Sequence, residues 1–106
     1  MPADIPPRVE DFRTSHPEIW KAFVALAEQC HEAGPLSERE RRLVKLALCI
    51  GAGLEGGTHS AVRNAHHAGL EQADLTHVAV LAVSTLGFPA AMRAMSWVHD
   101  QGSRRG

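Results

Sequence analysis

Apolar residues recur every three to four positions through most of this chain, which is the spacing of amphipathic helices. The repeats fall into five blocks, separated by short segments that contain glycine or proline. They predict helices over residues 16–33, 38–50, 55–68, 72–86 and 89–101. No segment alternates apolar and polar residues with a period of two, so no strand is expected. The pattern therefore predicts an all-α fold of about five helices joined by short loops.

Two of these helices begin with a capping sequence. Ser15 and Ser37 are each followed three residues later by glutamate, and such a pair satisfies the free amides of a first helical turn. Pro17 adds a residue that is favoured just inside a helix start. We therefore expect helices to begin at both serines and to end at Gly34, within residues 51–53 and at Gly69.

The helix expected over residues 72–86 has no polar face. Most residues from Leu75 to Leu86 are apolar, and a helix that is apolar all round must be buried all round. In so small a domain one face of each helix would normally remain in water. The simplest explanation is that other subunits cover it, so the sequence predicts a homo-oligomer.

Composition limits the remaining possibilities. The chain has 106 residues, 44% hydrophobic and 22% charged, with a formal net charge of −1. A surface for nucleic acid or acidic membrane needs a basic excess, so neither is expected. No segment has the ~20 apolar residues of a membrane span, and no signal peptide is evident, which favours a cytoplasmic protein. We expect an N-terminal arm over residues 1–14, a helical domain over 15–102 and a disordered tail over 103–106.

The two cysteines give no recognisable motif. Cys30 and Cys49 each lie among apolar residues of a predicted helix, and they do not form a CxxC pair. We interpret both as small buried hydrophobic residues, because a disulfide is unusual in a reducing compartment.

Candidate chemistry concentrates in the glycine-rich segment 51–57 and the helix that follows it. Glu55 and His59 are four residues apart and share one face of a helical turn. Three interpretations remain open: an exposed charge pair, an acid–base pair in which Glu55 orients His59, or two ligands of a metal completed elsewhere. Arg63, one turn further on, is a candidate clamp for a carboxylate, although a surface ion pair is the simpler role.

Other polar residues are best explained by structure alone. His66 and His67 stand near a helix end, where a protonated imidazole is favourable. His77 lies in the apolar helix, as a hydrogen-bonded core histidine or, less simply, as a pocket residue. Residues 38–42 mix arginine with glutamate and predict a solvent-exposed face.

Three segments of the chain resemble the carboxymuconolactone decarboxylase family, which includes the alkylhydroperoxidase D-like (AhpD-like) proteins. The segments are Arg42–Leu48 with the glycine-rich turn after it, Asp74–Ala82 and Gly87–Met92. The resemblance covers roughly residues 15–100. It implies an all-α, AhpD-like bundle that assembles into homotrimers or homohexamers.

The catalytic residues of that family are not repeated here. Where its peroxidase branch has a glutamate, two cysteines of a CxxC motif and a histidine, this chain has Arg42, Leu54, Gly57 and Ala61. Attack on a peroxide needs a reactive thiolate near a base, so AhpD-like peroxidase activity is disfavoured. The decarboxylase branch has the same histidine, and His59 lies two residues before that position.

These observations favour a cofactor-free, decarboxylase- or isomerase-like enzyme acting on a small carboxylate or lactone. His59 would be the acid–base group, Glu55 would orient it, and Arg63 would hold the anion together with the amides of Gly56 and Gly57. The alternative is an oligomer that binds a small ligand or a divalent metal through Glu55 and His59. The expected partners are further copies of the chain and a small molecule.

Overall fold

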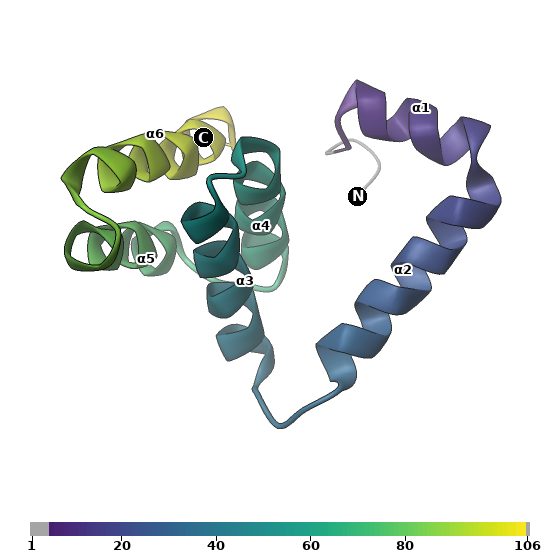
Figure 1. Cartoon of the computed structure of the whole chain (residues 1–106), viewed down its shortest axis with the longest axis horizontal. Helices are drawn as coiled ribbons and strands as arrows, with labels where there is room; N and C mark the ends of the chain where they lie inside the picture. Colours follow the sequence, from purple (N-terminus) through teal and green to yellow (C-terminus); the bar gives the residue numbers. More distant parts are fainter. Residues whose placement is uncertain (1–4, 106) are drawn as a thin grey trace. The chain divides into compact units, whose positions relative to one another are not determined.

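A computed structural model describes residues 5–105, with side chains described as far as residue 100. The described chain forms helices and no strand, which confirms the all-α prediction (Figure 1). The helices are α1 Pro7–Ser15, α2 Pro17–Glu32, α3 Glu38–Ala52, α4 Glu55–His67, α5 Gln72–Thr85 and α6 Phe88–Arg105. None of the helices within the described range is both long and apolar enough to cross a bilayer.

The chain divides into two compact units, with the boundary between Pro35 and Leu36. The first unit contains α1 and α2, and neither helix has a buried residue. On α2 the large apolar side chains of Ile19, Phe23 and Leu26 are all exposed. This unit therefore has helices but no apolar core of its own.

Helix α1 lies where the sequence predicted an irregular arm. Pro7 occupies the first turn, where its missing N–H costs nothing. The hydroxyl of Ser15 donates to the carbonyl of Asp11 at 2.8 Å, so Ser15 closes α1 and does not cap α2. The capping box predicted at Ser15 is therefore wrong, and α2 begins after His16 without a side-chain cap.

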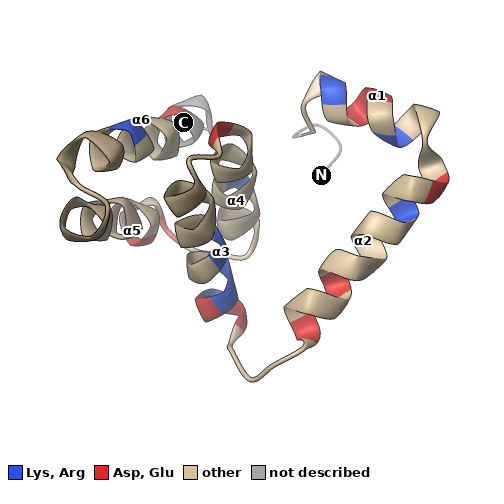
Figure 2. Cartoon of the chain, viewed as in Figure 1, with Lys and Arg blue, Asp and Glu red and all other residues tan. Residues whose placement is uncertain are grey.

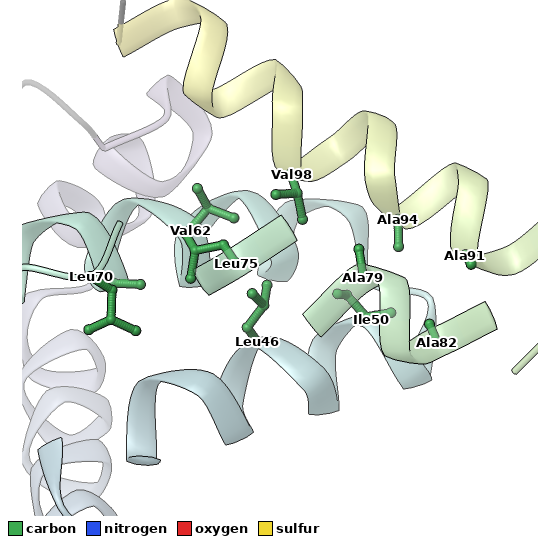
Figure 3. Close-up of a cluster of buried hydrophobic side chains, with 11 residues drawn as sticks. Leu46, Ile50, Val62, Leu70, Leu75, Ala79, Ala82, Ala91, Ala94 and Val98 are labelled. Carbon is green, nitrogen blue, oxygen red and sulfur yellow. The ribbon is translucent and has the colours of Figure 1, made fainter. Parts of the chain in front are cut away.

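The second unit holds the apolar core. Helix α5 packs against α3 and α6, and α4 packs against α3 and α6. Figure 3 shows side chains from all four helices pointing toward one another. The buried apolar residues are Leu46 and Ile50 of α3, Val62 and Ala65 of α4, Leu70, Leu75, Ala79 and Ala82 in and before α5, and Ala91, Ala94 and Val98 of α6. The many alanines let the α5 and α6 backbones approach closely.

Capping and glycine explain where the helices of this unit begin and end. The capping box predicted at Ser37 is confirmed: Glu40 N–H donates to Ser37 Oγ at 3.1 Å, and Ser37 N–H donates to Glu40 Oε1 at 2.8 Å. Gly53 ends α3 with a φ of +71°, a left-handed conformation that favours glycine. The backbone of α6 stays helical to Arg105, beyond the end expected near residue 101, and Gly106 lies outside the described residues.

Helix α5 buries one side only within the single chain. Leu75, Ala79 and Ala82 enter the core, whereas Val80, Leu81, Val83 and Leu86 are exposed. A helix that is apolar all round thus presents an uncovered apolar side in this chain.

Candidate functional site

The turn between α3 and α4 brings Cys49 and Gly57 close together. Only Gly53 and Leu54 separate the helices, and Leu54 N–H donates to the Cys49 carbonyl at 3.0 Å. The left-handed Gly53 reverses the chain, so the end of α3 lies beside the start of α4. A Cβ atom built on Gly57 would be 3.1 Å from Cys49 Sγ. Glycine at position 57 therefore leaves room for the thiol.

A pocket of about 310 Å³ lies between α3 and α4. Its α3 residues share one helical face, and so do its α4 residues. Two lining side chains are cationic, three are neutral and polar, and none is acidic. The lining residues are Arg42, Lys45, Leu48 and Cys49 of α3 and Gly57, Ser60, Ala61 and Asn64 of α4.

Ion pairs at the start of α3 hold one of these cations in place. Figure 2 shows charged residues of both signs gathered there. Arg42 Nε donates to Glu38 Oε2 at 2.8 Å, and Arg41 Nη2 donates to Glu38 Oε1 at 3.0 Å. Nε is the Arg42 nitrogen that bonds Glu38, and a guanidinium carries further N–H donors on its two terminal nitrogens.

The pocket also changes the chemistry of its cysteine. Burial raises the pKa of the Cys49 thiol, and the nearby charge of Lys45 offsets part of that rise. Cys49 is half-buried, and it is a thiol at neutral pH because removal from water disfavours the thiolate. Cys30, in contrast, is exposed on α2, so its predicted burial is wrong.

Of the residues predicted from the sequence, Gly57 lines this pocket, whereas Glu55, Gly56, His59 and Arg63 do not. Glu55 and His59 lie on α4 about half a turn away from the pocket-lining face. Glu55 is exposed, and no hydrogen bond or ion pair joins it to His59 in the described chain. Arg63 is half-buried and makes no ion pair among the described side chains, contrary to the simpler role expected for it.

His59 nevertheless has one unusual property. Its ring is half-buried, and Nε2 is buried with no hydrogen-bond partner among the described residues. A buried imidazole nitrogen without a partner is costly, so a hydrogen-bond partner from outside the described chain would be favourable at this atom.

No metal-binding cluster accompanies it. The part of the chain that the structure describes contains no group of three histidine, cysteine, aspartate or glutamate side chains placed to hold a metal. His66 instead contacts the Leu70 carbonyl at 3.2 Å and Gln72 Oε1 at 3.0 Å. Those contacts tie the end of α4 to the start of α5, in agreement with a structural role for His66.

The opposite side of α3 borders a second, apolar groove of about 380 Å³ shared with α5. Arg39 bridges to Asp74 at one end, with nitrogen–oxygen distances of 2.9 and 3.2 Å. The Arg39 hydrogen bond, followed by one from the Glu71 backbone N–H, lowers the pKa of Asp74 to about 2. His77 is exposed and lines this groove, so its expected role as a core histidine is wrong.

Comparison with known proteins identifies the family. The model of the carboxymuconolactone decarboxylase family matches residues 17–100, which include α2 as well as the second unit. The chain belongs to the carboxymuconolactone decarboxylase family. A family member from Legionella pneumophila, solved in its apo form, has a similar fold, with a TM-score of 0.75 at 21% sequence identity. The match covers 91% of this chain and 86% of that protein. No curated protein matches the chain.

Family membership allows the lining of the α3–α4 pocket to be compared with the catalytic positions of the family. By its resemblance to the peroxidase branch of the carboxymuconolactone decarboxylase family, the chain is expected to have counterparts of a glutamate, two cysteines and a histidine at four positions. Three of them, Arg42, Gly57 and Ala61, line the pocket. In this member the acidic, thiol and imidazole groups are replaced by a cation, a glycine and an alanine. Sequence reasoning noted the replacements but missed that Lys45, Cys49, Ser60 and Asn64 lie around the same space.

Proposed function

We propose that this carboxymuconolactone decarboxylase-family protein binds a small carboxylate in the α3–α4 pocket. The observation that supports this most is the lining itself, in which Arg42 and Lys45 occur without an acidic residue. Guanidinium groups bind carboxylates through paired hydrogen bonds, and a nearby ammonium adds attraction. A pocket of about 310 Å³ is at the small end of ligand sites, which favours a compact molecule.

The neutral lining groups define how the rest of such a ligand is held. Ser60 and Asn64 offer a hydroxyl and an amide one helical turn apart on α4, suited to a second oxygen of the ligand. Leu48 and Ala61 supply apolar contact for a short carbon skeleton. We therefore propose a small carboxylate or lactone-derived acid as the ligand class.

A pair of arginine variants tests the binding. Arg41 and Arg42 both bond Glu38, but only Arg42 lines the pocket. Succinate titration followed by NMR is expected to shift the amides of Gly57, Ser60 and Ala61. Arg42→Gln should weaken succinate at least tenfold, because a charge-assisted bond is lost. Arg41→Gln should bind like the wild type. The proposal is wrong if the amide shifts lie elsewhere or both variants behave alike.

A second function rests on the buried and unpartnered Nε2 of His59. We propose that His59 exchanges a proton with a substrate in a decarboxylase- or isomerase-like reaction, with Glu55 four residues earlier assisting it. Arg63, which lies one turn beyond His59, would hold the substrate anion in this function. Because Glu55 is exposed, the arrangement would be completed by the substrate or by another copy of the chain.

Turnover of a γ-lactone carboxylate, followed by NMR of the products, tests this second function. His59→Gln should abolish turnover, while His67→Gln, on the same helix but exposed, should not. A divalent metal held by Glu55 and His59 is the remaining alternative, and metal analysis of the same His59→Gln variant tests it. Unchanged turnover and unchanged metal content would contradict both roles for His59.

We also propose that the chain forms a homo-oligomer, a trimer or a hexamer. The exposed apolar residues of α5 and the apolar α3–α5 groove support self-association. Dithiol peroxidase activity is the least favoured function, because Leu54 and Gly57 replace the paired cysteines.

A further inference from the structure

We propose that Cys49 is a covalent capture site for small electrophiles that carry a carboxylate. The cationic lining would hold the carboxylate, and the Cys49 sulfur would bond to the electrophilic carbon. This inference rests on the proposed carboxylate binding, and it adds a reactive group and a narrower ligand class to it.

The helix geometry places the Cys49 thiol and the two cationic side chains on one face of α3. Lys45 and Arg42 precede Cys49 by four and seven residues on the face of α3 that lines the pocket. These separations correspond to about 6 and 10 Å along the helix axis. Lysine and arginine side chains are long and flexible, so their charged ends can lie closer to the Cys49 sulfur than these axial separations. A molecule with one or two carbons beyond its carboxylate therefore fits between a cation and the thiol.

The Cys49 sulfur and Gly57 both line the pocket and lie close to each other. The space that a side chain would occupy at position 57 lies 3.1 Å from Cys49 Sγ and 3.3 Å from the Leu54 Cβ. The sulfur therefore packs against α4 at this glycine, and a larger residue there would crowd it. Cys49 also lines the pocket and is half-buried, so part of its side chain remains exposed.

The capture step balances without any oxidant or further reactant. With iodoacetate as the probe, the thiol loses its proton to water and the sulfur attacks the methylene carbon. A carbon–sulfur bond forms, the carbon–iodine bond breaks, and iodide leaves with the bonding electrons. With an unsaturated carboxylate, the sulfur adds to the double bond and the neighbouring carbon takes a proton from water.

Charge selectivity separates this site from an ordinary surface thiol. Iodoacetate and iodoacetamide have nearly the same size, but only iodoacetate is an anion. The same thiolate attacks both reagents, so the ratio of their rates at one cysteine does not depend on how much thiolate is present. Burial slows both reactions at Cys49 by raising its pKa, and the ratio still reports the charge of the pocket. Exposed Cys30, between Glu28 and Glu32 along α2, is the internal reference.

The experiment measures both alkylation rates at each cysteine of the full chain by peptide mass spectrometry. The iodoacetate-to-iodoacetamide ratio at Cys49 should exceed that at Cys30 by about fivefold, the size of one partly screened charge interaction. Arg42→Gln should lower the Cys49 ratio toward that of Cys30, whereas Arg41→Gln should not. Saturating succinate should slow iodoacetate labelling of Cys49 but not of Cys30.

Three results would overturn the capture site: equal ratios at the two cysteines, an equal fall in both arginine variants, or no protection by succinate. The succinate titration separates this failure from that of the proposed function. If the pocket amides still shift with succinate, binding stands and only capture is wrong. If they do not, carboxylate binding fails as well. Circular dichroism of both variants checks that loss of fold does not imitate loss of charge.

Discussion

Helix α3 has two long sides, and each borders a space of similar size but different character. Toward α4 it presents Arg42, Lys45 and Cys49, which line a pocket of about 310 Å³. Toward α5 it presents Leu43, Val44 and Ala47, which line a groove of about 380 Å³. Size therefore does not distinguish the two spaces, whereas charge and polarity do.

The difference favours a different kind of binding partner for the space on each side of α3. A polar, cationic pocket recognises a small anion through a few directed hydrogen bonds. An apolar groove offers hydrophobic contact area without directed hydrogen bonds, which suits the apolar face of another protein chain. Family membership alone would not separate these roles, because both spaces lie within the matched residues.

The largest expected effect is on stability, at a core residue of α3, the helix that borders both spaces. Leu46 of α3 is fully buried in the core. Leu46→Ala should lower the free energy of unfolding by about 2–5 kcal/mol, through lost burial and the cavity that remains. Urea unfolding followed by circular dichroism measures this loss. Leu48→Ala, at an exposed site on the same helix, should change it by less than about 1 kcal/mol, and similar values for both would contradict this account of the core.

The next effect separates the apolar side from the polar side. Leu81 is exposed and lines the α3–α5 groove. Leu81→Glu should weaken self-association about 10- to 100-fold, the equivalent of losing the burial of one leucine, and leave succinate binding unchanged. Light scattering at several protein concentrations measures the assembly. Ser84→Glu, exposed on α5 outside the groove, is the control. A wild-type chain that is monomeric throughout, or a Leu81→Glu assembly that is unaltered, would refute this role of the groove.

A smaller effect on stability is expected in the wall of the polar pocket, at Gly57. Alanine is favoured over glycine in a helix by about 1 kcal/mol, but a Cβ at position 57 would crowd the Cys49 sulfur. Gly57→Ala should therefore stabilise the Cys49→Ala protein more than the wild type, with a coupling of about 0.5–1 kcal/mol. Urea unfolding of the four proteins measures it. Gly56→Ala, whose Cβ would meet nothing within 4 Å, should show no coupling to Cys49.

The smallest effect concerns the ion pair at the end of the apolar groove. The pKa of Asp74 falls from its ordinary value of 3.8 to about 2, chiefly through the Arg39 hydrogen bond. Because the folded pKa is the lower one, the stabilisation is complete above about pH 4 and is lost as the pH falls to 2. Asp74→Asn should thus lower the melting temperature slightly at neutral pH and not at pH 2. In an Arg39→Gln background the same substitution should have little effect at either pH.

Local signals predicted most of the helices of the second unit. Ser37 with Glu40 fixed the start of α3, and Gly69 follows the end of α4 within two residues. Helix α1 is not predicted by the sequence because a proline-rich segment with little periodicity is typical of an irregular arm, although Pro7 occupies a position where proline starts helices. At Ser15 the hydroxyl had two possible backbone partners, and the one inside α1 was satisfied.

The candidate pocket was much harder to predict. Arg42, Lys45 and Cys49 recur at helical spacing, and so do Gly57, Ala61 and Asn64, so each face was present in the sequence. Which faces meet depends on the Gly53 turn and on the packing of α3 against α4, and neither follows from spacing. Glu55 and His59 carry chemistry that is recognisable from the sequence, but they lie on another side of α4.

The start of α4 also has a consequence for motion. This helix begins after Leu54 without a side-chain cap, and Gly56 and Gly57 stand in its first turn. Each glycine loses more backbone entropy on folding than alanine would, so this turn opens at lower cost than the buried middle of the helix. Amide hydrogen exchange at Gly56 and Gly57 should therefore be faster than at Val62 and Ala65. Because Gly57 lines the pocket, opening of this single helical turn would also change the wall of the pocket.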